Sequence, residues 1–282
     1  MRLASILRDG RAVPALVGDR GVVAIEDLKP GLPADAMAFV DLEAWPDVVA
    51  LARQAPDGVF LPKGDVVFTA PYRRPRKIWG IGLNYRDHAA DLNESTPDQP
   101  ASFIKADHTI IGPDEPIVIP RQSRRTTVEA ELGIIIGRYC RDVSEDEAFD
   151  YVWGVTTILD QTAEDILQLN PRYLTRSKNF PTFFCFGPEL VPMSLVRERF
   201  GSLEEIEVTT VVNGDRRRSN VVANMTHRPA SLISFHSQMM PLFPGDIIST
   251  GTPGAIVVAD GDFAEAVIPG IGRLGTGVKA EK

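Results

Sequence analysis

Residues 126–137 read TTVEAELGIIIG, and the alternation around the two glutamates predicts a β-strand. Because strand side chains point alternately to the two faces of a sheet, Glu129 and Glu131 should share one face. The opposite face should be apolar, formed by Val128, Ala130, Leu132 and Ile134. Adjacent carboxylates repel each other, and hard oxygen donors favour divalent ions, so the acidic face indicates a metal site. The alternative interpretation is a solvated sheet face that binds no ion.

A third acid is expected from the next strand. Residues 154–160 read GVTTILD, an apolar run of strand length that ends in Asp160 and is followed by helical spacing. Asp160 is therefore the natural third ligand for a cation. Three carboxylates would leave about half of an octahedral coordination shell to water and substrate, as Mg²⁺ prefers.

Composition limits the classes of function. The chain has 282 residues and a net charge of −8, which argues against a nucleic-acid surface. Cys140 and Cys185 are its only cysteines, and two distant thiols fit a reducing compartment. No apolar run approaches the roughly 20 residues of a membrane span, and charged residues interrupt the apolar N-terminus. We therefore expect a cytoplasmic protein that binds neither nucleic acid nor membrane.

The chain divides into a small N-terminal α/β domain, residues 1–70, and a strand-rich catalytic domain, residues 71–282. Short strands are expected up to Ile25, with turns at residues 9–10 and 19–21, followed by a helix over residues 39–54. In the larger domain, Asn213-Gly214 after an apolar run predicts a hairpin. Its expected helices are few and cover residues 144–151, 162–169 and 229–240.

Several motifs occur together in a specific order. They are GLNYRDHAAD (82–91), EAEL (129–132), RSKNF (176–180), FGP (186–188), VNG (212–214) and PGDIISTGTPG (244–254). From about Pro71 to Val278 the chain thereby resembles the fumarylacetoacetate hydrolase family, in particular acylpyruvate hydrolases and 2-hydroxyhepta-2,4-diene-1,7-dioate isomerases. The resemblance implies an α+β, mostly β fold, a β-roll behind a variable N-terminal domain. It also implies Mg²⁺ or Mn²⁺ as cofactor, a small oxo-acid substrate and a homodimer.

The resemblance also assigns roles to individual residues. The metal carboxylates match Glu129, Glu131 and Asp160, and the active-site lysine matches Lys178. The lid histidine matches His88, with Asp91 three residues later on the same face of an expected short helix, where it would orient the ring. Substrate contacts are expected from Tyr85, Arg86 and Thr252.

These groups suit the cleavage of a C–C bond in a 2,4-dioxo acid of the acylpyruvate type. The metal would bind the 2-oxo and carboxylate oxygens and stabilise the expelled enolate, with Lys178 adding positive charge. His88 would deprotonate the water that attacks the distal carbonyl. The same site could serve an oxo-acid decarboxylase, a dienoate isomerase or a 2-oxo-alkenoate hydratase. A non-catalytic metal- or ligand-binding protein is the alternative from another class.

The chain departs from the family pattern near the substrate. Asp91 stands where relatives usually carry Glu, and Pro181 stands where Asp is common. Glu164 replaces an arginine that in many relatives faces the substrate, which removes a candidate carboxylate clamp. Four arginines could supply the missing charge, and the sequence does not rank them: Arg86, Arg121, Arg124 and Arg125.

Overall fold

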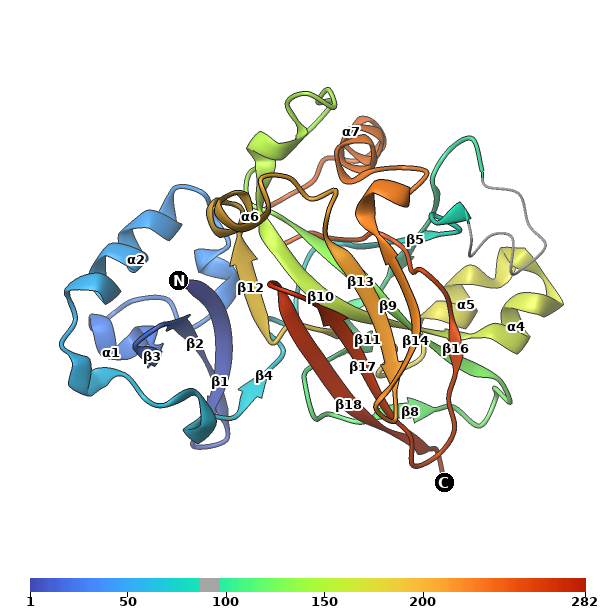
Figure 1. Cartoon of the computed structure of the whole chain (residues 1–282), viewed down its shortest axis with the longest axis horizontal. Helices are drawn as coiled ribbons and strands as arrows, with labels where there is room; N and C mark the ends of the chain where they lie inside the picture. The colour runs from blue at the N-terminus through green and yellow to red at the C-terminus, as the bar shows by residue number, and fades with distance from the viewer. Residues whose placement is uncertain (87–96) are drawn as a thin grey trace.

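A computed structural model of the chain describes residues 1–86 and 97–282 (Figure 1). His88 and Asp91 lie outside the described residues. The N-terminal strands and helices occupy one side of the molecule in Figure 1, two sheets fill its centre, and α4 and α5 lie on the opposite side.

The N-terminal region is a three-stranded meander with helices against it. Its strands are β1 (Arg2–Arg8), β2 (Arg11–Gly18) and β3 (Gly21–Ala24), and its helices are α1 (Ile25–Leu28) and α2 (Ala44–Gln54). The expected turns are confirmed, with Asp9 and Gly10 both at positive φ. Single 3₁₀ turns cover Ala36–Phe39, Asp57–Val59 and Lys63–Asp65. The expected helix over residues 39–54 begins later, at Ala44.

The large sheet contains both predicted acidic strands. Its main path runs β3-β2-β1-β12-β10-β9-β15-β5-β6. The strands not yet given are β5 (Ile78–Gly82), β6 (Ala101–Lys105), β9 (Thr126–Ile136), β10 (Val152–Ala163), β12 (Glu189–Pro192) and β15 (Ile247–Ser249). Short strands β4 (Phe68–Thr69), β7 (Ile110–Ile111), β11 (Phe184–Phe186) and β16 (Ile256–Val257) pair off this path. Because β1 pairs with β12, the N-terminal strands continue the large sheet, and the domain boundary at residue 70 stays a prediction.

A second sheet covers the apolar face of β9. Its order is β14 (Asp215–Val221), β13 (Glu207–Val212), β17 (Phe263–Ile268), β18 (Gly272–Ala280) and β8 (Ile117–Ile119). One apolar cluster contains Val128, Ala130, Leu132 and Ile134 together with residues of the second sheet. The predicted alternation of β9 is thus confirmed, and the glutamates point away from the second sheet. The hairpin at Asn213-Gly214 is also confirmed.

The helices of the larger region are short. They are α4 (Glu164–Leu169), α5 (Leu174–Lys178), α6 (Met193–Phe200) and α7 (Pro229–Met239), with 3₁₀ turns at Asp107–Thr109, Ala148–Tyr151, Pro171–Tyr173 and Val222–Asn224. The helix expected over residues 144–151 is wrong, since only the last four residues form a 3₁₀ turn. The Ser144 side chain and N–H donate to the Glu147 carboxylate as at a helix start, but residues 145–147 form a turn, and eight residues before β10 are too few for a stable helix of their own. No helix among the described residues is long and apolar enough to cross a membrane.

Candidate metal centre and active site

Three buried carboxylates meet on the face of the large sheet that points away from the second sheet. Glu129 and Asp160 are opposite each other in the β9–β10 ladder, and Glu131 follows two residues along β9. Donor oxygens from all three lie within 4.8 Å of one another. The three residues are 7 %, 1 % and 0 % exposed for Glu129, Glu131 and Asp160. The structure therefore brings together the three predicted metal carboxylates.

Hydroxyl and backbone donors hold one oxygen of each glutamate. Glu129 Oε1 accepts hydrogen bonds from Thr127 Oγ1 at 2.9 Å and from Thr162 Oγ1 at 2.6 Å. Glu131 Oε2 accepts from Ser249 Oγ at 2.5 Å and from the Gly251 N–H at 2.8 Å. These bonds fix the carboxylates in place, as the groups around metal ligands commonly do.

Lys178, the last residue of α5, lies in the middle of the cluster. Its Nζ is 2.9 Å from Glu129 Oε2 and 2.6 Å from Asp160 Oδ2. The same atom lies 4.9 Å from the centre of the Phe103 ring, which stacks on Gly80, where a Cβ would meet the ring at 2.3 Å. Burial acts to lower the pKa of Lys178, but the neighbouring carboxylates outweigh burial and raise this pKa. Lys178 therefore carries its proton and a positive charge.

Lys105 is a second lysine of the cluster, which the sequence analysis missed. Its side chain is fully buried, and its Nζ lies 2.5 Å from Asp160 Oδ1 and donates to the Lys178 carbonyl at 2.5 Å. Burial lowers its pKa to about 8, against the opposing charge of Asp160. A signal was present, because strand alternation places Lys105 on the same face as Phe103 at the end of an apolar run.

The donor set fits a divalent cation. Burial, reinforced by the charge of Asp160, raises the pKa of Glu131 to about 8, as expected for carboxylates that repel each other. If all five groups are ionised, three carboxylates against two ammonium groups leave one net negative charge. Three buried oxygen donors that converge on one point match the preference of Mg²⁺ and Mn²⁺ for hard ligands.

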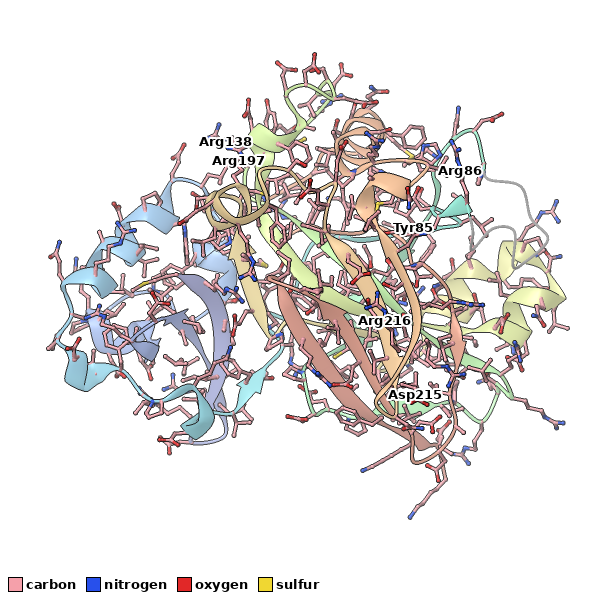
Figure 2. All side chains as sticks on the ribbon, viewed as in Figure 1. Tyr85, Arg86, Arg138, Arg197, Asp215 and Arg216 are labelled. Carbon is pink, nitrogen blue, oxygen red and sulfur yellow. The ribbon has the colours of Figure 1, made fainter. Side chains whose placement is uncertain are left out.

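Two of the three predicted substrate contacts, Tyr85 and Thr252, lie near Glu131 of this cluster. Tyr85 is fully buried, its hydroxyl has no hydrogen-bond partner among residues 1–86 and 97–282, and burial, aided by the Glu131 charge, raises its pKa. Thr252 follows Gly251, the donor to Glu131, and its hydroxyl donates to the Gly254 carbonyl at 3.2 Å. Arg86 is exposed and lies beside Tyr85 where the chain leaves β5 (Figure 2). Their roles, and those of His88 and Asp91, stay predictions.

Asn84 joins two segments of the site. Its Nδ2 donates to the Thr250 carbonyl at 2.7 Å and to the His227 carbonyl at 2.9 Å. Gly251 has a φ of +97°, and a Cβ there would lie 2.8 Å from the Asn84 Cβ. Only glycine allows this close approach, which aims the Gly251 N–H at Glu131. The motif that begins at Gly82 thus also supports the carboxylate cluster.

The chain is similar to proteins of one family, in sequence and in structure. A family model described as fumarylacetoacetate (FAA) hydrolase C-terminal matches residues 77–279. The chain belongs to the fumarylacetoacetate hydrolase family. The predicted family and fold class are therefore confirmed.

Members of the fumarylacetoacetate hydrolase family that resemble this chain have different activities. Oxaloacetate tautomerase FAHD2A of Homo sapiens, a mitochondrial protein, is 33 % identical over 242 residues, which cover 84 % of this chain and 75 % of that protein. The structure of maleylpyruvate hydrolase from Sphingobium sp. SYK-6, in complex with manganese(II) and pyruvate, superposes with a TM-score of 0.83 at 27 % identity. The structure of 5-carboxymethyl-2-hydroxymuconate delta-isomerase from Mycobacterium smegmatis superposes with a TM-score of 0.78 at 29 % sequence identity. Both comparisons cover the whole of each chain.

Proposed function

We propose that the protein is a Mg²⁺- or Mn²⁺-dependent hydrolase that cleaves a C–C bond in a 2,4-dioxo acid of the acylpyruvate type. The observation that carries the proposal is the buried cluster of Glu129, Glu131 and Asp160, with Lys178 against it. With a divalent cation and every group ionised, the cluster and its two lysines carry one net positive charge. A positive, buried site suits an anionic oxo acid. The similarity to a maleylpyruvate hydrolase that holds manganese and pyruvate supports this choice.

Each residue of the cluster has a distinct task in this proposal. Glu129, Glu131 and Asp160 hold the cation, which when bound supplies Lewis-acid chemistry at oxo-acid oxygens. Lys178 keeps a fixed positive charge beside them, where it stabilises negative charge that develops on the substrate oxygen. Because its ammonium group is already held by two carboxylates, it needs no reorganisation during the reaction.

Water activation is assigned to residues near the end of β5. His88, oriented by Asp91, is proposed as the base that takes a proton from the attacking water. Tyr85 has a buried hydroxyl free among the described residues, and with Arg86 and Thr252 it is proposed to contact the substrate. We also propose that the protein acts as a homodimer in the cytoplasm.

The second candidate is a reaction without water, either tautomerisation or isomerisation of an oxo acid. It is favoured by the similarity to an oxaloacetate tautomerase and a delta-isomerase. Both candidates need the carboxylate cluster and Lys178, whereas only hydrolysis needs an activated water.

A product assay tests the proposed function. Purified protein, with and without Mg²⁺ or Mn²⁺, would be given a panel of acylpyruvates, and separately oxaloacetate. We expect metal-dependent release of pyruvate from at least one acylpyruvate, and a His88→Ala loss of about 10²- to 10⁴-fold in that reaction. If His88→Ala lowers the acylpyruvate and oxaloacetate reactions equally, the second candidate is preferred. No pyruvate release from any acylpyruvate with either metal would contradict hydrolysis.

A further inference from the structure

Glu164, which occupies the position of the substrate-facing arginine of many relatives, is paired with Arg125, the residue just before β9. Its side chain is 13 % exposed, and its Oε2 lies 2.5 Å from Arg125 Nε. Its Oε1 accepts a hydrogen bond from Gln168 Nε2 at 3.2 Å. The positive charge missing at position 164 is therefore present next to it, on a different segment.

Arg125 lies in line with the metal carboxylates. The β9–β10 ladder ends at Thr126 opposite Ala163, and the Glu164 N–H extends it by donating to the Arg125 carbonyl at 2.8 Å. Thr127 and Thr162 mark the acidic face, since both hydroxyls bond to Glu129. Arg125 comes directly before β9, and continuing the alternation of that strand would place it on this same face, as its ion pair with Glu164 two residues after Thr162 supports. Four residues at about 3.3 Å each separate Arg125 from Glu129 along the strand, roughly 13 Å.

The guanidinium group of Arg125 keeps donors for a ligand. Arginine has five N–H groups, and within the described part of the chain Glu164 engages only Nε while neither Nη makes a hydrogen bond. The side chain is 51 % exposed, so the fork is open to a ligand. A planar fork with two Nη donors matches a carboxylate in a bidentate arrangement.

The structure distinguishes among the four arginines that could supply the positive charge missing at position 164. Arg121 is 70 % exposed and pairs with Glu281, near the end of β18. Arg124 is exposed at a bend two residues before β9, and its backbone N–H, not its side chain, bonds to Asp165 Oδ2 at 2.8 Å. Arg86 is exposed, and it forms no ion pair with any of the described residues. Arg125 alone of the four touches the side chain of residue 164.

We propose that Arg125 binds a second carboxylate, at the end of the substrate far from the metal, and that Glu164 positions it. An extended arginine side chain spans part of the distance to the cluster, and the substrate spans the rest. The substrate class is then a dicarboxylic 2,4-dioxo acid rather than an acylpyruvate with a neutral acyl group. This inference rests on the proposed function of the same site.

Substrates with and without the second carboxylate test the inference. For Arg125→Ala, we expect KM for maleylpyruvate to rise about 10- to 100-fold with little change in kcat, as for a lost charged hydrogen bond. The KM change for acetylpyruvate should be at least tenfold smaller. Arg124→Ala, a neighbouring removal of the same charge, is the matched control. The exchange Arg125→Glu with Glu164→Arg should recover part of the maleylpyruvate loss that Arg125→Glu alone causes.

A binding experiment separates this inference from the proposed hydrolysis. Calorimetry with Mn²⁺-loaded protein would compare 2-oxoadipate, which has a distal carboxylate, with 2-oxobutyrate, which has none. Wild type should prefer 2-oxoadipate, and Arg125→Ala should lose that preference even if no acylpyruvate is cleaved. Equal affinities in wild type, or an unchanged preference in Arg125→Ala, would overturn the role of Arg125. Equal kinetic losses on maleylpyruvate and acetylpyruvate would also overturn it.

Discussion

Two lysines with different surroundings share the carboxylate of Asp160. Lys178 Nζ contacts Oδ2 and also Glu129, whereas Lys105 Nζ contacts Oδ1 and backbone carbonyls. Lys178 faces the metal carboxylates directly, and Lys105 is enclosed at the end of β6. Their substitution should therefore affect different properties of the protein.

Lys178→Met should lower kcat about 10²- to 10³-fold and leave metal affinity unchanged or higher. The reason is that the ammonium charge acts on the developing substrate anion, while its removal takes a competing cation away from the carboxylates. Steady-state kinetics at saturating Mg²⁺ and a Mn²⁺ titration would measure both. A variant that loses metal binding but keeps kcat would contradict this role.

Lys105→Met should destabilise the metal-free protein by about 3 kcal/mol, because it leaves a buried carboxylate with one fewer cation. Denaturant unfolding with and without Mn²⁺ would measure this loss, and the loss should be smaller with the ion bound. Arg121→Ala, which breaks an exposed ion pair, is the control and should cost at most about 0.5 kcal/mol. Similar costs for the two variants would show that Lys105 has no special electrostatic role.

Metal affinity should fall as the pH is lowered from 8.5 to 6.5. Since the folded-state pKa of Glu131 is raised to about 8, the carboxyl holds a proton below that pH. A cation must displace this proton, so affinity should fall by up to about tenfold per pH unit. Mn²⁺ titration in buffers of different ionisation enthalpy would detect the released proton. An affinity that stays constant across this range would exclude a protonated Glu131 in the metal-free protein.

At the scale of elements, the predictions that succeeded rest on local periodicity. The two-residue alternation of β9 decides which face is acidic, and strand geometry then brings Glu129 and Glu131 together. The sequence also identified Asp160, because an acid directly after an apolar run has few structural reasons to be there, although β10 continues past it to Ala163. Its register opposite Glu129 depends on how β10 pairs with β9, which no single segment encodes.

The features of the site that the sequence did not predict depend on contacts between residues far apart in the chain. Lys105 lies 55 residues before Asp160, so strand alternation near Lys105 predicts the face of its side chain but not its ion pair with Asp160. The partnership of Arg125 with Glu164 likewise needs the β9–β10 register. The incorrect helix over residues 144–151 shows the opposite failure, because the local spacing and the Ser144–Glu147 contact both favour a helix, yet this short segment forms only a 3₁₀ turn before β10.

Gly251→Ala should destabilise the protein and weaken metal binding together. The φ of +97° costs an alanine about 1–3 kcal/mol. The added Cβ would also lie 2.8 Å from the Asn84 Cβ and 3.0 Å from the Ile81 carbonyl oxygen, which adds to that cost and should shift the N–H donor to Glu131. Gly261→Ala is the matched control, because its φ is +90° but no atom lies within 4 Å of the added Cβ. Thermal unfolding and Mn²⁺ titration of both variants would separate backbone strain from the close approach. If the two variants lose equal amounts of thermal stability and of Mn²⁺ affinity, the contact with Asn84 is unimportant.

At the scale of the whole molecule, one strand pair links the two sheets and the site. The apolar face of β9 and β10 packs against the second sheet, and their acidic face contacts Lys105 of β6 and the helices α4 and α5. The buried charges are thus held by a rigid core on one side and by short helices on the other. The sequence predicted both the fold class and the family from the ordered motifs. Of these motifs, residues 129–132 lie in β9 and residues 176–178 end α5, so two of them supply this framework and its lysine.

The central claim is that Glu129, Glu131 and Asp160 form one divalent-metal site. Calorimetric titration with Mn²⁺ tests it most directly, on wild type, Glu131→Ala and Asp160→Ala. The account predicts one site per chain in wild type and no detectable binding in either variant, because two carboxylates hold such an ion poorly in water. Thermal unfolding should confirm that both variants remain folded. Unchanged Mn²⁺ affinity in the two folded variants would contradict the claim.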